Sequence, residues 1–482
     1  MPISYFPQTI NEEYTINKYN YFKFGKDKNL ITTDHGAWCL LDDSEYRALR
    51  TLNVHKDPNL FNFLKEKGIV ITEESFDSVV GSYRDRFHFL FRGPTLHIIV
   101  PTFRCNMQCI YCHSIPKAPK TKGFDMDKDT AKKIVDFILT SPSKLLAIEF
   151  QGGDCLLNFD IVKFVIDYGK EQAIKKNKKL KFSLVTNLTL MDEEKLKFLK
   201  DEHIMGLATS LDGPKEVHNR NRQYLNGSGS YDDVVYWIKR IKTEFEYDFN
   251  LRALTTITKF SLQYPKEIVD EFVNLGFNSV WFRPLNNLGL ANLKFKEISY
   301  SPEEFIKFWN SGLEYIIKLN SSGKLFQEIL TRYLLMKILN RYDPMMVDIQ
   351  SPCGAGIGQL LYDNKGNIFT CDEAKVLGEA FMLGNVFENT LYDVMHNPTV
   401  YSMVSISSKL STLCDACAWS PYCGICPVDI YVSQRTIVPK LAESMRCKIF
   451  KSIIEEIFRM LLFSEKERSI FLNWVSSQSS QL

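Results

Sequence analysis

The middle of the chain repeats one pattern: a short apolar run rich in β-branched residues alternates with a longer segment of helical periodicity. The six runs are LHIIVP from Leu96, LLAIEFQ from Leu145, FSLVTN from Phe182, GLATSLDG from Gly206, LRALTTIT from Leu251 and SVWFRPL from Ser279. The helical segments begin near Met126, Phe159, Asp192, Tyr231 and Gln263. This alternation predicts an α/β fold with a parallel sheet, a partial (β/α)6 barrel of the TIM type. In such folds the reactive groups gather at the carboxyl ends of the strands.

The twelve cysteines of the chain fall into groups. Cys105, Cys109 and Cys112 lie in the stretch CNMQCIYC, just past the first apolar run. Thiolates are the standard ligands of iron–sulfur clusters, and a four-iron cluster ordinarily takes four of them. Three thiols in one tight loop would therefore leave one iron without a protein ligand. The alternative, a structural zinc site, needs four ligands, usually in two separated pairs.

The C-x3-C-x2-C spacing, with Tyr111 before the last cysteine, resembles the radical SAM superfamily. The resemblance implies a 4Fe-4S cluster whose open iron chelates S-adenosylmethionine (SAM), with Tyr111 in the SAM site. The segment QGGDC after the second run is similar to the family's Gly-Gly-Glu-Pro turn, which implies SAM contacts from Gly152, Gly153 and Asp154. This chain has Asp154 in place of Glu and Cys155 in place of Pro. We interpret Cys155 as a buried small side chain near the site rather than as a ligand.

After the fourth run the chain reads SLDG and then HNRNR. In related maturases a serine at this place and an arginine downstream hold the ribose and the carboxylate of SAM. The resemblance therefore implies that Ser210 and Arg222 bind SAM. We interpret His218 as a hydrogen-bonding residue at a helix end rather than as a metal ligand.

Seven further cysteines follow residue 350: Cys353, Cys371, Cys414, Cys417, Cys423, Cys426 and Cys447. A zinc ribbon would separate its cysteine pairs by about 15–20 residues. The two pairs between Cys414 and Cys426 are five residues apart, too close for that fold. The arrangement resembles the SPASM domain, which adds two auxiliary four-iron clusters to a radical SAM core. Zinc, or thiols without metal, is the alternative for this region.

The resemblance to the SPASM domain implies a ligand set for each auxiliary cluster. Cys414, Cys417, Cys423 and Cys447 would hold the outer cluster, auxiliary cluster II. Cys353, Cys371 and Cys426 would hold the inner one, auxiliary cluster I, so either a non-cysteine ligand completes it or one iron is open. Asp372 stands where sulfatase maturases have the acid that accepts a proton from the substrate. We expect Asp372 to be the catalytic base; the alternative is that it caps a turn or pairs with a cation.

The first ninety residues differ from the barrel pattern. Alternating strands with a turn at His35-Gly36 precede a helix capped by Ser44 and a second helix that ends at Gly68. The pattern favours a small winged-helix-like module, similar to the peptide-recognition domain often fused to maturases. DNA binding and a mere packing extension are the alternatives. The expected domains are 1–90 for this module, 91–300 for the radical SAM core, 301–350 for a helical bridge, 351–450 for the SPASM domain and 451–482 for a C-terminal helix.

The formal net charge is +2, with 59 basic and 57 acidic side chains, so no global field favours nucleic acid or an anionic membrane. The chain lacks a secretory signal and an apolar run of about 18 residues. The stretch IFKSIIEEIFRMLLF carries charges at helical spacing and predicts an amphipathic helix. We expect a cytoplasmic protein that binds neither nucleic acid nor membrane, with a precursor peptide and a reductant such as flavodoxin or ferredoxin as its partners.

One closer resemblance covers almost the whole chain. The segments FLFRGPTLHIIVPTFRCN, IEFQGGD, TSLDGP with HNRNR, and DIQSPCGAGIGQLLYDNKGNIFTCDEA are similar to the His-Xaa-Ser system radical SAM maturases. The resemblance implies an enzyme with SAM and three 4Fe-4S clusters that modifies a ribosomally made precursor peptide through a 5′-deoxyadenosyl radical. Two alternatives remain: a sulfatase-type maturase that oxidises a protein Cys or Ser, and an iron–sulfur electron carrier without SAM turnover.

Overall fold

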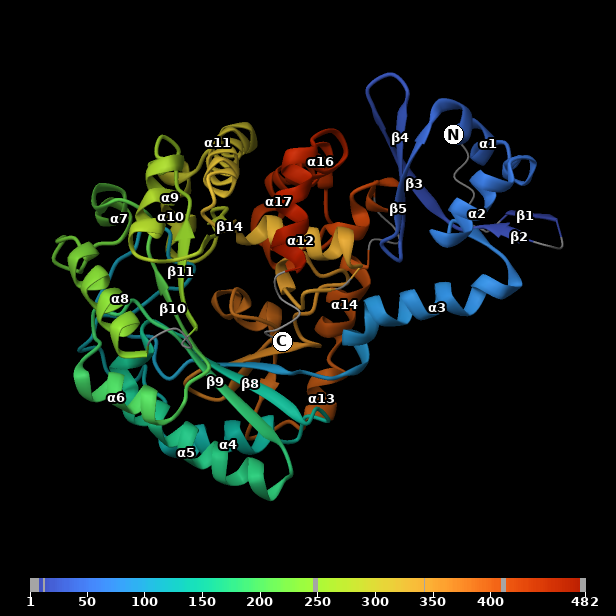
Figure 1. Cartoon of the computed structure of the whole chain (residues 1–482). Helices are drawn as coiled ribbons and strands as arrows, with labels where there is room; N and C mark the ends of the chain where they lie inside the picture. The colour runs from blue at the N-terminus through green and yellow to red at the C-terminus, as the bar shows by residue number, and fades with distance from the viewer. Residues whose placement is uncertain (1–7, 12–13, 246–249, 342, 409–412, 477–482) are drawn as a thin grey trace.

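A nine-stranded sheet forms the centre of the molecule (Figure 1). The computed structural model describes residues 8–11, 14–245, 250–341, 343–408 and 413–476. The strand order is β13-β11-β10-β9-β8-β7-β15-β16-β17, and the pairs from β13 through β15 are parallel. The core strands are β7 (Leu96–Ile99), β8 (Leu145–Phe150), β9 (Lys179–Val185), β10 (Gly206–Ser210), β11 (Asn250–Thr256) and β13 (Phe282–Arg283). The predicted parallel sheet with six successive strand segments is confirmed.

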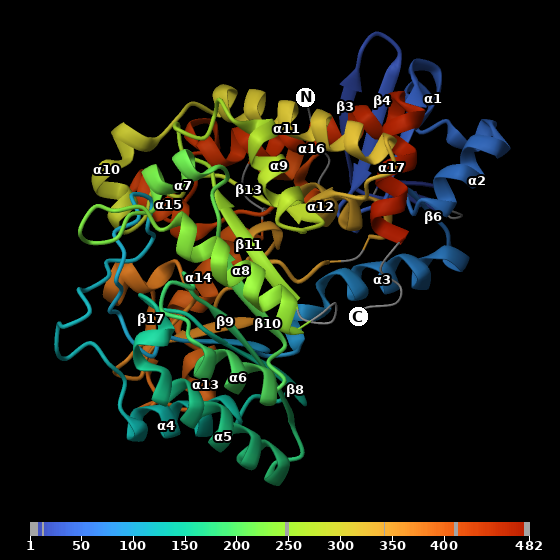
Figure 2. The same cartoon turned by 60° about the vertical axis from the view of Figure 1, so that its left-hand side comes forward.

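The helices that alternate with these strands lie on the outer face of the curved sheet (Figures 1 and 2). They are α4 (Lys128–Ile138), α5 (Phe159–Lys175), α6 (Glu193–Asp201), α7 (Lys215–Asn221), α8 (Tyr231–Phe245) and α9 (Pro265–Asn274). In α4, residues Ala131, Ile134, Val135 and Ile138 are buried at the spacing of one helix face. Asp127 and Asp192 accept backbone N–H bonds at the starts of α4 and α6.

The sixth apolar run forms two short strands where the sequence predicts one. β12 (Ser279–Val280) pairs with β14 (Gln327–Glu328), whereas β13 pairs with β11. The strand is interrupted at Trp281, so that its two halves pair with different strands. The partner β14 lies far along the chain, which is why local pattern does not reveal the split.

The chain returns to the core sheet after residue 350. β15 (Gln359–Tyr362) pairs in parallel with β7, and the hairpin strands β16 (Asn367–Phe369) and β17 (Met382–Asn385) extend the sheet beyond it. The buried His97 and Tyr362 side chains are hydrogen-bonded across the β7–β15 pair, at 2.9 Å between Nδ1 and Oη. The cysteine-rich segment therefore continues the same sheet as the core.

The N-terminal region contains two small antiparallel sheets with three helices. One sheet holds β3 (Tyr19–Phe24), β4 (Lys28–Thr33) and β5 (Trp38–Asp42), and the other holds β1 (Gln8–Asn11), β2 (Tyr14–Ile16) and β6 (Val70–Ile71). The helices are α1 (Asp43–Arg50), α2 (Pro58–Glu66) and α3 (Glu73–Phe87). The predicted turn at His35-Gly36 joins β4 to β5, and the two predicted helices are present.

The predicted N-cap of α1 is wrong. The cap is Asp42, whose carboxylate accepts backbone N–H bonds from Ser44 and Glu45. The Glu45 carboxylate in turn accepts the Asp42 backbone N–H at 2.8 Å. This reciprocal pair of hydrogen bonds satisfies the backbone N–H groups of Glu45 and Asp42, and the helix begins at Asp43, two residues before the start that a Ser44 cap predicts.

The N-terminal sheet packs on the cysteine-rich region (Figure 1). The Thr32 hydroxyl donates to the Ala418 carbonyl at 2.9 Å, and the rings of Phe22 and Trp419 lie 4.8 Å apart. Phe24 from this sheet belongs to the main hydrophobic core of the barrel. Removal of the first eighty residues would therefore expose core surface, so peptide recognition by this region is better tested with point variants than by truncation.

The remaining helices cover the open side of the barrel and the cysteine-rich segment. They are α10 (Leu290–Ile298), α11 (Pro302–Ser321), α12 (Ile329–Leu339), α13 (Leu391–Met395), α14 (Pro398–Ser407), α15 (Pro427–Gln434), α16 (Met445–Phe463) and α17 (Glu465–Ser476). The predicted C-terminal amphipathic helix corresponds to α16 followed by α17, and residues 477–482 of that prediction lie outside the described residues.

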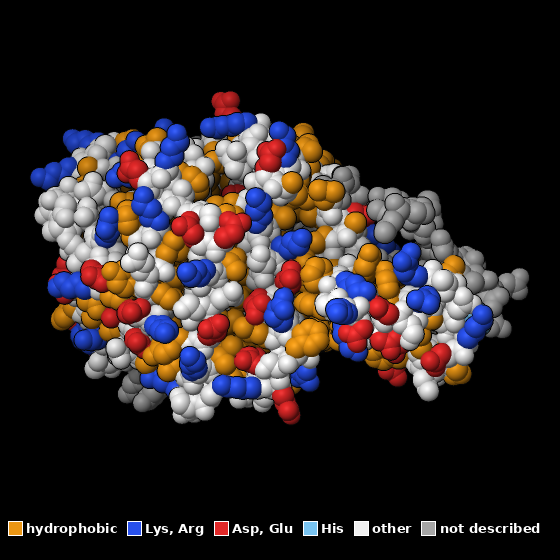
Figure 3. Space-filling view, turned by 90° about the horizontal axis from the view of Figure 1, so that it is seen from above, with side chains coloured by type: hydrophobic (Ala, Val, Ile, Leu, Met, Phe, Trp, Pro, Cys, Tyr) orange, Lys and Arg blue, Asp and Glu red, His pale blue; other side chains and the backbone are white. Residues whose placement is uncertain are grey.

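The surface carries mixed charge. On the face shown in Figure 3, Lys and Arg side chains lie among Asp and Glu side chains and apolar patches. Across the described ranges, no helix has the length and apolar character needed to cross a bilayer.

Candidate active site

A cavity of about 550 Å³ lies at the carboxyl ends of the core strands, where the cysteine-rich segment meets the barrel. It collects most of the residues that the sequence singles out. These are Cys105, Cys109, Tyr111, Cys112, Gly152, Gly153, Ser210, Arg222, Cys353, Cys371, Asp372 and Cys426. The predicted SAM site and the predicted inner cluster thus share one enclosure. The Asp154 side chain and the four cysteines of the outer set are not among its lining residues.

The cysteine loop after β7 is fixed by backbone hydrogen bonds. The Cys105 N–H donates to the Lys117 carbonyl at 2.8 Å, and the Cys112 N–H donates to the Cys109 carbonyl at 3.2 Å. The Asn187 side-chain amide donates to Cys105 Sγ at 3.8 Å. Three thiols from one short loop therefore face one cavity in a defined arrangement.

Burial disfavours the ionised form of the thiols in this loop. Burial raises the pKa of the Cys109 thiol to about 11, and burial followed by Asp154 and the neighbouring thiols raises that of Cys105. Cluster assembly must therefore displace protons from these thiols. In the described part of the chain, no three His, Cys, Asp or Glu side chains surround a common point as a single metal ion requires.

The glycine pair after β8 lets the cysteine loop approach the sheet. A Cβ atom on Gly152 would lie 2.3 Å from the Thr102 carbonyl oxygen, and one on Gly153 would lie 2.2 Å from that of Arg104. The Gly153 N–H donates to Thr102 at 3.0 Å, and the Asp154 N–H donates to Arg104 at 2.8 Å. The absence of side chains at these two positions thus fixes the distance between the glycine turn and the cysteine loop.

We expect Gly153→Ala to disturb this contact. The added methyl group must displace the Arg104 backbone, and overpacking of this kind costs about 1–3 kcal/mol. The expected results are a lower melting temperature and less iron bound per chain after anaerobic reconstitution. Gly81→Ala in α3 is the matched control, because a Cβ there meets nothing within 4 Å. If the Gly153 variant reconstitutes and melts like the Gly81 variant, the close approach is not limiting.

Asp154 turns its carboxylate away from the cavity. The side chain is buried and accepts hydrogen bonds from the Thr186 hydroxyl at 2.8 Å, the Asn187 N–H at 2.8 Å and the Leu156 N–H at 3.0 Å. Burial raises its pKa. Asp154 therefore ties the ends of β8 and β9 together behind the cysteine loop. Its neighbour Cys155 is also buried, as the sequence predicts.

Arg222 is held by a buried polar chain. Its Nη1 donates to the Tyr111 hydroxyl at 2.9 Å, and that hydroxyl donates to Asp212 Oδ1 at 3.0 Å. Asn221 donates to the second Asp212 oxygen at 3.1 Å. Burial raises the pKa of Asp212 to about 6, with the Arg222 charge opposing that rise. These hydrogen bonds thus direct the Arg222 guanidinium group at the cavity, beside the cysteine loop.

We expect Tyr111→Phe to weaken SAM binding about tenfold. The variant removes the hydroxyl that joins Arg222 to Asp212, and a hydrogen bond to a charged group is worth about 1.5–3 kcal/mol. Equilibrium dialysis with SAM measures the effect, with iron content checked alongside. Tyr168→Phe is the control, since its hydroxyl bonds Asp136 at 2.8 Å, away from the cavity. Equal affinity in both variants would show that Tyr111 does not position Arg222 for SAM.

His218 is buried next to Asp212, which belongs to the hydrogen-bonded group that holds Arg222. Its Nδ1 accepts the Asp212 backbone N–H at 3.4 Å, and its Nε2 lies 3.1 Å from the Ser230 hydroxyl. The prediction that His218 is a hydrogen-bonding residue is confirmed.

Several cavity residues escape the sequence reasoning. Glu149, Asn187, Arg252, Arg283 and Glu373 line the cavity. Glu149, Asn187 and Arg283 lie at or just after the carboxyl ends of core strands, whereas Arg252 is the third residue of β11. That placement is a usable signal for polar residues at strand ends. Asp212 lies inside the SLDG motif, but its role is not predictable from the sequence because its contact with Tyr111 joins residues about a hundred positions apart.

The inner cysteines meet around a buried acid. Cys353, Cys371 and Cys426 are buried or half-buried at the cavity wall, and each thiol has its pKa raised first by burial. The Glu373 carboxylate contributes a further rise for all three. The pKa of Glu373 is raised to about 8, first by burial and then by Asp348 and Asp372. Asp372 itself is half-buried, and its Oδ1 accepts from the Gln359 amide at 3.5 Å.

The outer cysteines gather elsewhere. The pKa of the Cys447 thiol is raised to about 11, first by burial and then by the neighbouring thiols of Cys423, Cys414 and Cys417. Residues 414–423 come from short turns, whereas Cys447 lies in the first turn of α16. The grouping of these four matches the set that the sequence predicts, although their role as ligands stays a prediction.

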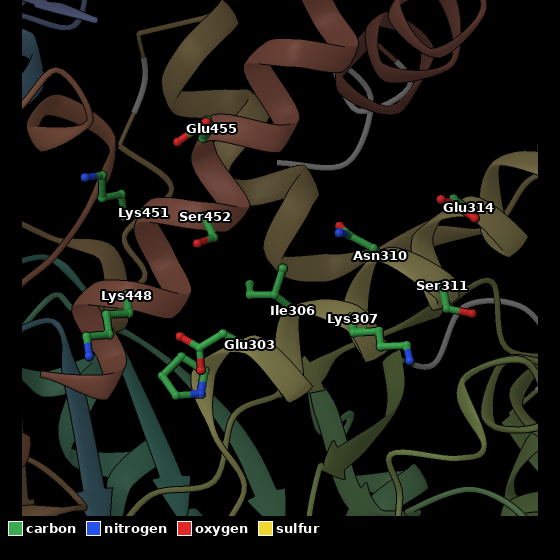
Figure 4. A pocket seen from close by; sticks show the side chains of 11 residues that line it. Glu303, Ile306, Lys307, Asn310, Ser311, Glu314, Lys448, Lys451, Ser452 and Glu455 are labelled. Atoms are coloured by element: carbon green, nitrogen blue, oxygen red, sulfur yellow. The ribbon is translucent and has the colours of Figure 1, made fainter.

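A second cavity of about 680 Å³ lies between α11 and the start of α16 (Figure 4). Lys448 and Lys451 from α16 and Lys307 from α11 line it together with three acids: Glu303, Glu314 and Glu455. It shares no lining residue with the first cavity. Its charges are mixed, and it lies next to Cys447.

Comparison with known proteins places these features in context. Residues 99–281 match the family model of the radical SAM superfamily. A cysteine-type anaerobic sulfatase-maturating enzyme of Clostridium perfringens is 25% identical over 333 residues, which cover 66% of this chain and 84% of that protein. The radical SAM cyclopropyl synthase TigE of Paramaledivibacter caminithermalis is 23% identical over 477 residues, which cover 94% of this chain and 90% of that protein.

Two solved structures share the fold. Native anSMEcpe with bound AdoMet superposes with a TM-score of 0.65 at 20% identity and covers 78% of this chain and 99% of its own. Streptococcus suis SuiB bound to precursor peptide SuiA superposes with a TM-score of 0.53 at 15% identity and covers 88% of this chain and 98% of its own.

Proposed function

We propose that this chain is a radical SAM enzyme of the maturase type, with the α/β fold of that superfamily, and that it modifies a side chain of a ribosomally synthesised precursor peptide. Membership implies SAM and a 4Fe-4S cluster as cofactors. When bound, the two supply a 5′-deoxyadenosyl radical that takes a hydrogen atom from an unactivated carbon, while the protein positions the substrate and excludes water. An electron carrier without SAM turnover is accordingly set aside.

One observation carries the proposal: a single cavity joins the cysteine loop to the inner cysteines and Asp372. A peptide side chain bound there would lie between the predicted SAM site and the predicted auxiliary cluster I. The cavity volume of about 550 Å³ is in the range of small-molecule sites, about 300–1,000 Å³. It leaves room for a cofactor and a short stretch of substrate rather than for a folded protein surface.

Each residue group then has a task. Cys105, Cys109 and Cys112 hold the SAM cluster, while Gly152 and Gly153 keep the turn close to that loop. Arg222, aimed by Tyr111 and Asp212, binds the carboxylate of SAM, and Ser210 binds its ribose. Asp372 accepts the proton that the substrate releases when its radical forms.

The cysteine-rich segment would supply the path for electrons. In this proposal residues 351–450 form a SPASM domain with two auxiliary clusters, the outer one on Cys414, Cys417, Cys423 and Cys447 and the inner one on Cys353, Cys371 and Cys426. These cysteines would hold clusters able to carry the electron that the substrate radical releases to an external electron acceptor. The grouping of the thiols into these two sets supports the assignment.

Residues 1–90 would recognise the peptide. The support is the antiparallel sheet β3-β4-β5, whose outer strands offer edges on which an extended peptide can add a strand. The proposed radical SAM core is 91–300, with 301–350 as a helical bridge and 451–482 as the C-terminal helical part. Binding of precursor should slow amide exchange in β3 or β5, and unchanged exchange in both would contradict this role.

The direct test of the function uses anaerobically reconstituted enzyme, SAM, dithionite and the short peptides encoded beside its gene. The expected result is 5′-deoxyadenosine together with a peptide whose mass has changed. Mass spectrometry identifies the modified residue and the bond. Formation of 5′-deoxyadenosine with every such peptide left intact would contradict a precursor-peptide substrate.

A sulfatase-type maturase is the second candidate. It is favoured by the 25% identity to a cysteine-type sulfatase-maturating enzyme over 84% of that protein's length. A synthetic peptide that carries the cysteine of a sulfatase active-site segment separates the two functions. Oxidation of that cysteine, with no change in the neighbouring short peptides, would replace the first proposal with this one.

A further inference from the structure

The inner cysteine set has three members, and a buried carboxylate lies among them. We propose that Glu373 is the fourth ligand of the cluster held by Cys353, Cys371 and Cys426, which it closes through a carboxylate oxygen. The inference rests on the auxiliary cluster of the proposed function. It answers the choice between an open iron and a non-cysteine ligand in favour of the ligand.

The contacts of Glu373 point one oxygen at the thiols. The side chain is 9% exposed. The Cys426 thiol donates to Oε2 at 3.6 Å, while the Asn286 amide donates to Oε1. Asn286 thus holds the carboxylate in one orientation, with Oε2 facing the Cys426 thiol. A group oriented in this way needs little rearrangement to bind iron.

Glu373 is also central to the set. Its charge acts on the thiols of Cys353, Cys371 and Cys426 alike. It lies two residues after Cys371, so the turn that presents that thiol also presents the carboxylate. The fourth ligand of a cluster must lie beside the thiols that hold the other irons, and the contact of Glu373 with Cys426 places it there.

Three other acids lie nearby, and one of them, Asp429, contacts Cys426 through its backbone N–H at 3.4 Å, while its carboxylate interacts electrostatically with Arg446. Asp348 pairs with Arg446 at 3.0 Å, and Asp372 accepts from Gln359. Among the carboxylates in the described ranges, Glu373 is the one that hydrogen-bonds an inner thiol. Asp372 therefore stays available to the substrate, whereas Glu373 is directed at the cluster.

The chemistry of the donor set is consistent. A four-iron cluster ordinarily takes four protein ligands, and the chain offers three thiols here. Ligands bind iron in their deprotonated forms, so assembly replaces four buried acidic protons with one cationic iron–sulfur core. The Arg446 guanidinium, which acts electrostatically on Glu373 and on the thiols of Cys353 and Cys426, offsets part of the remaining negative charge. A cluster closed in this way would pass electrons and would not bind the peptide directly.

The test asks whether the inner cluster has an iron open to an added ligand. All variants in this test are made in a protein in which Cys105, Cys109 and Cys112 are together replaced by alanine. That protein should keep about eight irons in two clusters. After reduction and addition of ¹³C-cyanide, electron–nuclear double resonance reports any cyanide bound to iron. We expect no ¹³C coupling when Glu373 is present, a clear coupling in Glu373→Ala, and none in Glu373→Cys, where a thiolate replaces the carboxylate. Asp372→Asn is the matched control and should show no coupling.

The outcomes separate the inference from the function on which it rests. A ¹³C coupling in the protein that retains Glu373, or no coupling in Glu373→Ala at full iron content, would overturn the ligand assignment while leaving the clusters in place. Loss of about four irons in Glu373→Ala that Glu373→Cys restores would support it. About four irons in the starting protein would mean that one auxiliary cluster is missing, which overturns both the inference and that part of the proposed function.

Discussion

Protein in which Cys105, Cys109 and Cys112 are all replaced by alanine is expected to lose about four of roughly twelve irons and all SAM cleavage. The reason is that these three thiols come from one loop, whose backbone hydrogen bonds hold it at the cavity. Iron analysis after anaerobic reconstitution and chromatographic detection of 5′-deoxyadenosine measure the two effects.

The matched control for this variant is Cys39→Ala. Cys39 is buried in the N-terminal core, apart from every predicted ligand set. It should keep full iron content and SAM cleavage. Should the triple variant still form 5′-deoxyadenosine, the SAM cluster lies elsewhere in the chain.

Asp372→Asn is expected to lower peptide product by about 100-fold, the scale of losing a positioned base, while iron content and 5′-deoxyadenosine formation persist. The substitution keeps the size of the side chain and its contact with Gln359, but it removes the basic oxygen that faces the cavity. Single-turnover assays that quantify 5′-deoxyadenosine and modified peptide together give the ratio of abstraction to product.

Glu373→Gln provides the contrast for this experiment. If Asp372 is the base and Glu373 is a ligand, Asp372→Asn lowers the amount of modified peptide without changing the iron content. Glu373→Gln instead alters the inner cluster. Wild-type turnover in Asp372→Asn would instead make Asp372 structural, and the proton would then leave through Glu373 or solvent.

The alternating pattern of the middle region was sufficient to predict the parallel sheet, because each strand there is an apolar run and each helix has one apolar face. The cysteine loop and the glycine pair could also be predicted from the sequence, because the residues that form each of them are close together in the chain. The structure adds the reason for the glycines: the Thr102 and Arg104 carbonyls occupy the space that side chains would need.

Contacts between distant segments could not be predicted in this way. β15 joins β7 although about 260 residues separate them, and Tyr111 meets Asp212 and Arg222 about a hundred residues away. Asp154, which the glycine motif associates with SAM, instead bonds Thr186 and Asn187. Whether a polar side chain faces the cavity or the wall depends on strand register and loop path, which local pattern does not specify.

The amino-acid sequence alone therefore determined the class of fold, the cysteine groups and the chemistry that they favour, because those depend on residue type and local spacing. Only the tertiary structure decided which groups share an enclosure. It brought the first three cysteines and the inner cysteines to one cavity, packed the N-terminal sheet on the cysteine-rich segment, and directed Glu373 rather than Asp372 at an inner thiol. The physical reason is that burial and orientation arise when segments far apart in the chain pack together, and each such contact depends on all of the others.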